Sequence, residues 1–194
     1  MQKKWETLLP VEIYYCSPAL SSDEKTLYIG TSSGLLGNHV QDQVFVAIGK
    51  DGCVYFGINT GNPTSAFFAL NYDGTLKWKF EPSDLPDDVP FTHFDIYSSP
   101  AIGSDGVVYF GQEFGRVYAL NTSDGSFVGM AKANAGITWS SPAIDSKGVL
   151  YISDISGMVH AFQTGSRGLD TLAAWPKFRY DNLNSGLVHR PYYK

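Results

Sequence analysis

The chain has 194 residues, of which 43% are hydrophobic and 14% aromatic, and its formal net charge is −5. This length and apolar content allow a real core and exclude a disordered or coiled-coil chain. The acidic balance argues against nucleic acid as a partner, and no apolar run reaches the roughly 20 residues of a membrane span.

The N-terminal segment, MQKKWE, lacks the apolar core of a signal peptide. Trp5 precedes Ala19 by 14 residues, the spacing that separates Gly129 from Ala143 in a later repeat. Residues 4–5 are therefore expected to form the fourth strand of a preceding repeat unit. Closed propellers commonly join their termini in this way, and a fragment cut from a longer array would begin in the same way.

The first half of the chain contains one incomplete and one complete copy of a two-hairpin pattern. Residues 17–30 predict a first hairpin, but too few residues follow for a complete second one. The run VFVAI at 44–48 fits either the third strand of this copy or the first strand of the next. The second copy continues with an aromatic run at 53–57 and a hairpin at 67–80 that is closed by an Asp-Gly turn.

A repeated phrase dominates the second half. Residues 98–111 read SSPAIGSDGVVYFG, and 42 residues later residues 140–153 read SSPAIDSKGVLYIS. A fixed period near 40 residues indicates a repeat architecture. Each copy has Pro at a strand start, a Gly-containing turn, and then a second hairpin, which predicts four short antiparallel strands per copy.

The phrases SSPAI, VYALN and LKWKF resemble the pyrroloquinoline-quinone-like (PQQ-like) β-propeller repeat, and the tail WPKFRYDNLNSG resembles an element that often flanks it. The resemblance implies an all-β fold of four-stranded antiparallel blades that stack face to face. Residues 1–174 would form the repeats and residues 175–194 the flanking segment. The blade units are expected near residues 11–43, 44–97, 98–139 and 140–174.

About three and a half blades fit in the chain, whereas relatives usually carry seven or eight, so a partial or small propeller is expected. An open arc would leave an apolar blade face uncovered, and such a face usually recruits a partner. We therefore predict a non-enzymatic binding or scaffold module for a protein, peptide or glycan, including a homo-oligomer that completes the propeller. The family resemblance favours the periplasm, the cell envelope or an extracellular location.

The alternative is a fragment of a PQQ-dependent quinoprotein dehydrogenase. Such enzymes typically hold the quinone with a stacked Trp, a disulfide between adjacent cysteines, and calcium. Here Cys16 and Cys53 lie far apart, and Trp139 is the one obvious stacking candidate. The sequence shows no nucleophile–base motif and no metal-ligand spacing, so we predict no cofactor, no metal and two buried free thiols.

Candidate binding residues come from loops that a propeller gathers on one face. They are Tyr14, Tyr15, His93, Asp95, Tyr97, Glu113, Trp139 and Asp154. His93 and Asp95 share a side of an extended chain, so they are expected either as a base or metal-ligand pair or as a local hydrogen bond. The aromatic members suit a binding rim or packing between blades. His160 occupies the repeat position of Tyr118, which favours packing.

Overall fold

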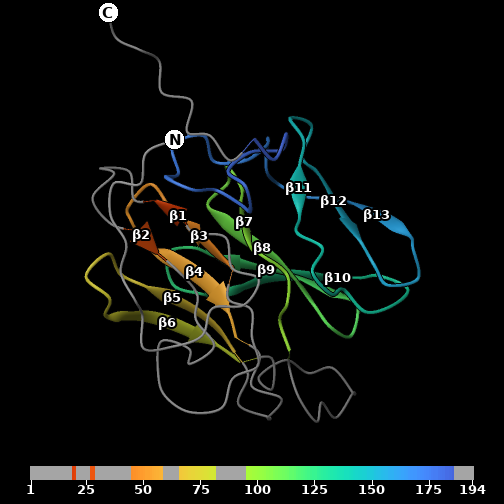
Figure 1. Ribbon diagram of the computed structural model, residues 1–194, viewed down its shortest axis with the longest axis horizontal. Helices are drawn as coiled ribbons and strands as arrows, with labels where there is room; N and C mark the ends of the chain where they lie inside the picture. Colours follow the sequence, from red (N-terminus) through yellow and green to blue (C-terminus); the bar gives the residue numbers. More distant parts are fainter. Residues whose placement is uncertain (1–18, 21–26, 29–44, 59–65, 82–94, 186–194) are drawn as a thin grey trace, which may run out of the picture.

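The computed structural model describes residues 19–20, 27–28, 45–58, 66–81 and 95–185, in which every regular element is a β-strand (Figure 1). All neighbouring strands pair antiparallel. None of these residues forms a helix long and apolar enough to cross a membrane. The all-β fold class predicted from the repeat is therefore confirmed.

The strands form four separate sheets. The first sheet pairs β1 (Ala19–Leu20) with β2 (Leu27–Tyr28). Blade A contains β3 (Val46–Ile48), β4 (Val54–Gly57), β5 (Phe67–Leu70) and β6 (Leu76–Phe80). Blade B contains β7 (Ala101–Ile102), β8 (Val107–Gln112), β9 (Arg116–Asn121) and β10 (Phe127–Lys132). Blade C contains β11 (Ala143–Ile144), β12 (Val149–Ser153) and β13 (Val159–Gln163).

Tight turns close the hairpins where the sequence predicts them. Gly106 and Gly148 adopt φ angles of 76° and 83°, a left-handed conformation that glycine adopts without steric cost. In the outer turns, the carboxylate of Asp124 accepts the backbone N–H of Ser126 at 2.9 Å, as Asp commonly does in turns. The ambiguous run at 44–48 is also settled, because β3 pairs with β4 as the first strand of blade A.

Blades A and B pack face to face through aromatic side chains. The Phe67 and Phe110 rings stack in parallel, with centroids 3.9 Å apart. Two further blade A side chains reach across: Tyr55 Oη and Trp78 Nε1 both donate to the Thr122 carbonyl oxygen, at 3.3 and 3.1 Å. Apolar burial and directed hydrogen bonds together therefore fix the relative orientation of these two blades.

Blade B packs on blade C through a second apolar cluster, in which Val117 and Tyr109 of blade B lie with Leu150 and Ile152 of blade C. The predicted free thiol of Cys53 is confirmed as buried. Cys16 lies outside the described residues. Blades A, B and C thus repeat the same stacking in sequence order (Figure 1).

Blade C differs from the four-stranded pattern, because its described sheet ends at β13. The chain then crosses to the inner strands of the other blades. Ile48 of β3 and Trp175 exchange two backbone hydrogen bonds, of 2.8 and 3.0 Å. Ile102 of β7 donates to the Pro176 carbonyl at 2.8 Å and accepts from the Asp170 N–H at 2.9 Å. The segment that follows β13 therefore leaves blade C and pairs with blades A and B.

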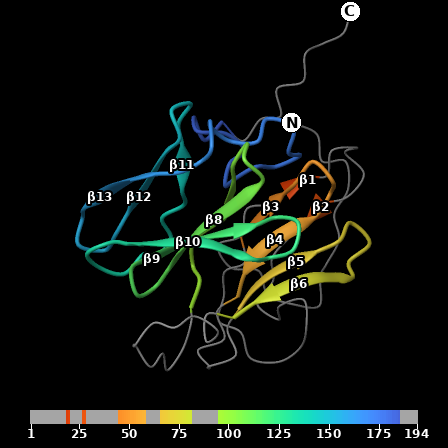
Figure 2. The ribbon, with the colours of Figure 1, turned by 180° about the vertical axis from the view of Figure 1, so that it is seen from behind.

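The same segment reaches the inner strand of blade C with a side chain. Asn182 donates from Nδ2 to the Ile144 carbonyl at 2.7 Å and accepts the Ile144 N–H at 3.3 Å. Nearby, the Lys177 ammonium donates to Asn184 Oδ1 at 2.7 Å, and burial lowers its pKa. Equivalent isoleucines of all three blades are thus bonded by residues 168–185, which we call the strap (dark blue in Figures 1 and 2).

Candidate functional site

The loops expected to form one binding face do lie together in the structure. Glu113 donates its backbone N–H to the Asp95 carbonyl at 3.0 Å, which joins the loop before blade B to the β8–β9 turn. Ile155 donates to the Gly136 carbonyl at 2.9 Å, which joins the loop before blade C to the β12–β13 turn. Backbone bonding of this kind gives the face a fixed shape.

Two of the predicted aromatic residues meet on this face. The Tyr97 and Trp139 rings pack edge to face, with centroids 6.3 Å apart and planes at 62°. Trp139 is 64% exposed and has a φ of 56°, a left-handed conformation that non-glycine residues rarely adopt. Strained, exposed aromatic residues are typical of ligand-binding positions. A binding role for this pair remains a prediction.

Asp154 is buried at the end of β12 and organises the turn that follows. Its Oδ1 accepts from Ser156 Oγ at 2.6 Å and from the N–H groups of Ser156 and Met158 at 2.9 and 3.2 Å. Its Oδ2 accepts the Ala135 N–H at 3.1 Å and lies 2.8 Å from His160 Nε2. The hydrogen bonds from Ser156 and His160 lower the pKa of the Asp154 carboxyl.

This depressed pKa predicts an acid-sensitive hairpin. A carboxyl group whose pKa is lower in the folded state stabilises the fold above its unfolded pKa, and this contribution is lost as the pH falls through the folded value. The Asp154 contribution should therefore be complete above about pH 5 and decline below about pH 4. Thermal unfolding followed from about pH 5 to about pH 2 should show a smaller decline in stability for Asp154→Asn than for the native chain. Equal declines would contradict the role given to this carboxylate.

His160 and Asp154 form the His–carboxylate pair that the structure shows, whereas the one predicted from sequence was His93 with Asp95. His93, Tyr14 and Tyr15 lie outside the described residues, so their role stays a prediction. His160 also stacks in parallel on Phe162, which agrees with the packing role expected for it. The signal for its hydrogen bond was available, because Asp154 and His160 flank one tight hairpin turn. Within the described residues, no group of three or more His, Cys, Asp or Glu side chains could hold a metal ion.

A second candidate surface is the face of blade C that points away from blade B. Tyr109 and Val117 of blade B are 5% and 4% exposed, because blade C covers them. Their repeat equivalents in blade C, Tyr151 and Val159, are 40% and 71% exposed. Among the strands that the structure describes, β13 forms the edge of its sheet, whereas the equivalent β9 pairs with β10.

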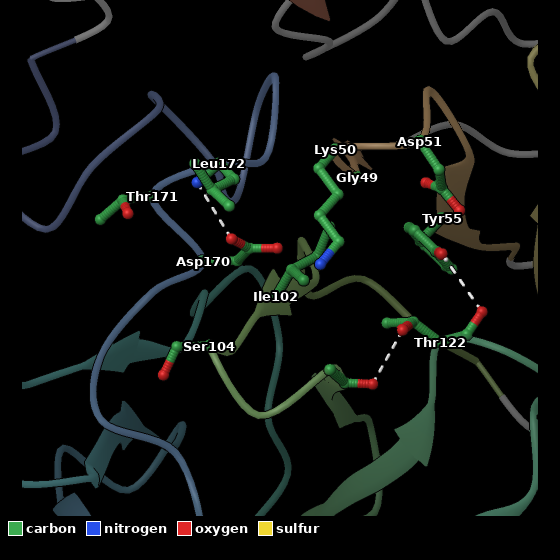
Figure 3. A pocket seen from close by; sticks show the side chains of 11 residues that line it. Gly49, Lys50, Asp51, Tyr55, Ile102, Ser104, Thr122, Asp170, Thr171 and Leu172 are labelled. Atoms are coloured by element: carbon green, nitrogen blue, oxygen red, sulfur yellow. Dashed lines mark hydrogen bonds between the residues drawn. The ribbon is translucent and has the colours of Figure 1, made fainter.

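A pocket of about 300 Å³ lies between blades A and B (Figure 3). One wall is the β3–β4 turn with Lys50, and another is the β7–β8 turn with Ser104. The strap closes the pocket with Asp170 and Leu172. None of the residues predicted from the sequence lines it. There is no local sequence signal for it, because its three walls are far apart along the chain.

Comparisons with solved structures give the fold. The computationally designed protein Ika4 is 16% identical, with a TM-score of 0.55 over 83% of this chain and 99% of that one. BamB from Moraxella catarrhalis is also 16% identical, with a TM-score of 0.51 over 75% of this chain. The chain spans 45% of the BamB chain. These likenesses support a β-propeller-like fold.

No family model matches the sequence, and no curated protein matches it. The PQQ-like resemblance therefore rests on the repeated phrases of the sequence itself, and the stacked antiparallel blades agree with the propeller architecture that it implies.

Proposed function

We propose that this chain is a non-enzymatic β-propeller module of the PQQ-like type, which binds an apolar β-sheet on the open face of blade C. The observation that carries the proposal is the contrast within one repeat: Tyr109 and Val117 are buried, and Tyr151 and Val159 are exposed. The equivalent side chains of blade B, Tyr109 and Val117, already form the interface between blades B and C. A second copy of this chain is the partner to which we assign this face.

The outer edge of β13, to which no described strand pairs, supports the same proposal. In blade B, β10 pairs with β9 from Arg116 to Leu120, and this strand shields the hydrogen-bonding edge. An exposed strand edge is a template for pairing with a strand from another chain. A partner sheet would therefore gain apolar burial on the face of blade C and backbone hydrogen bonds along its edge.

The proposal includes no cofactor, because the sequence contains no pair of adjacent cysteines of the kind found in the quinone-binding relatives. A location in the periplasm, in the cell envelope or outside the cell is part of the proposal and rests on the resemblance alone. The loop face with Tyr97 and Trp139 is proposed as an additional surface for a peptide or glycan.

Light scattering tests the blade C interface. We expect the native chain to self-associate with increasing concentration and Val159→Glu to remain monomeric, because burying an unpaired carboxylate is strongly unfavourable. Val128→Glu is a matched control, since Val128 is exposed on β10, away from this face. A native chain that stays monomeric at about 100 μM would contradict the proposal, since this concentration exceeds typical interface dissociation constants. Equal association of all three proteins would contradict it as well.

A further inference from the structure

The pocket between blades A and B contains two opposite charges that its own walls leave unpaired. Lys50 Nζ has no hydrogen bond or ion pair with any residue that the structure describes. Asp170 accepts the Leu172 N–H at 3.0 Å with one carboxylate oxygen, and no described residue bonds to the other oxygen. In Figure 3 the Lys50 and Asp170 side chains extend toward the same space from opposite sides.

The other charged group of the pocket lining, the Asp51 carboxylate, is already paired with Lys77 at 3.2 Å. The Ser104 hydroxyl accepts the Arg167 N–H at 3.0 Å, and the Thr122 hydroxyl donates to the Gly106 carbonyl at 2.8 Å. These bonds hold the turns of blade B in place around the pocket. Lys50 and Asp170 are consequently the charged residues of the lining that the described residues leave available to a bound molecule.

Tyr55 forms part of the inner wall of the pocket. Its side chain is buried, and its hydroxyl donates to the Thr122 carbonyl at 3.3 Å, which ties this wall to blade B. Burial raises the pKa of this phenol above its ordinary value. The Lys50 ammonium and the Asp170 carboxylate therefore border a space of about 300 Å³, within the lower range of small-ligand sites.

We propose that this pocket binds a small organic acid that also carries a hydroxyl or ammonium group. The carboxylate of the ligand pairs with Lys50, and its donor group bonds to Asp170. Both bonds to the charged side chains are charge-assisted, which makes them stronger than neutral hydrogen bonds. Sugar acids and α-amino acids share this chemistry.

This site is independent of the proposed blade C interface, because its walls come from blades A and B and from the strap. The strap carries Asp170, and the Asp170 N–H is bonded to Ile102 of blade B. The position of the carboxylate is thus fixed by the same hydrogen bonds that hold the strap on the inner strands. A preorganised carboxylate costs less to order on binding.

Isothermal titration calorimetry of the full chain tests the site with four small molecules. D-glucuronate and L-serine each carry a carboxylate and a donor, acetate lacks the donor, and D-glucose lacks the charge. We expect saturable binding of glucuronate, of serine or of both, with acetate and glucose at least about tenfold weaker because each loses one charge-assisted bond. Comparing the affinities for glucuronate and serine shows whether the pocket prefers a sugar acid or an α-amino acid.

Two variants test whether the ligand binds in this pocket. Lys50→Ala and Asp170→Asn should each weaken binding by about ten- to a hundredfold. The Asp170→Asn change keeps a side-chain oxygen that can accept the Leu172 N–H, so it removes the charge without removing that bond.

Lys147→Ala is the matched control, an exposed lysine in the equivalent turn of blade C, and should bind like the native chain. Absence of saturable binding of both acids at about 10 mM would overturn the proposal. An affinity unchanged in either pocket variant would overturn it too.

Discussion

Replacing Phe110 by Ala is expected to lower the free energy of unfolding by about 3–5 kcal/mol. The Phe110 side chain is fully buried between blades A and B, where it stacks on Phe67 at 3.9 Å and on Tyr118 at 5.5 Å. Ala would leave a cavity between two sheets whose other contacts hold them at a fixed separation. Trp78 lies beside Phe67, so urea unfolding followed by tryptophan fluorescence reports on this interface.

Phe127→Ala is the control for this variant. The Phe127 side chain is 44% exposed on β10, although its ring also stacks on a blade A aromatic, Phe80, at 6.5 Å. We expect its removal to cost less than about 1 kcal/mol, as is usual for surface substitutions. Similar losses for the two variants would mean that the parallel stack of Phe67 and Phe110 does not dominate the coupling of blades A and B.

The repeat in the sequence predicted the blades because the information for each hairpin is local. The SSPAI phrases predicted the starts of β7 and β11, and the β-branched and aromatic runs predicted β8 and β12. Strand type, turn residue and register are all encoded within about 15 residues of one another. Stacking then follows, since a single blade cannot bury both faces.

The strap could not be predicted in the same way. The sequence predicts a blade unit near residues 140–174 and a flanking segment at 175–194, without indicating where that segment packs. In the structure the described sheet ends at Gln163, and Trp175 pairs with Ile48, far away in the sequence. Such pairings leave no hydrophobic periodicity in the sequence of either segment. Each consists of a few hydrogen bonds between a β-strand and the non-strand backbone of the strap. The Asn182 side chain bonds to the backbone N–H and carbonyl of Ile144, as a neighbouring strand would. No sequence pattern predicts this pair of hydrogen bonds.

The candidate sites also differ in whether local sequence or tertiary pairing brings their residues together. The loop face was predicted, because the order of strands in a blade dictates which loops share an end. The sequence also indicated Tyr97 and Trp139, which do meet. Lys50 and Asp170 were not singled out, because one lies in a turn and the other in the strap. Their proximity depends on the tertiary pairing at Ile102.

Trp175→Ala should be the second strongly destabilising variant, with a loss of about 3 kcal/mol or more in the free energy of unfolding. Trp175 is buried, and its side chain packs with Val46, Val54 and Phe56 on the face of blade A that points away from blade B. Leu172→Ala provides the control, since Leu172 belongs to the strap but is 73% exposed. Chemical denaturation compares the three proteins.

Hydrogen exchange separates a strap effect from a general loss of stability. The amides of Ile48 and Ile102 donate to the strap carbonyls of Trp175 and Pro176, so loosening of the strap should speed their exchange first. The amide of Leu150, on the blade C side of the next interface, should be less affected. The pocket should lose ligand affinity in parallel, because Asp170 is held by the same hydrogen bonds. If instead all three amides accelerate equally, Trp175 stabilises the whole arc of blades and the strap does not open as a separate unit.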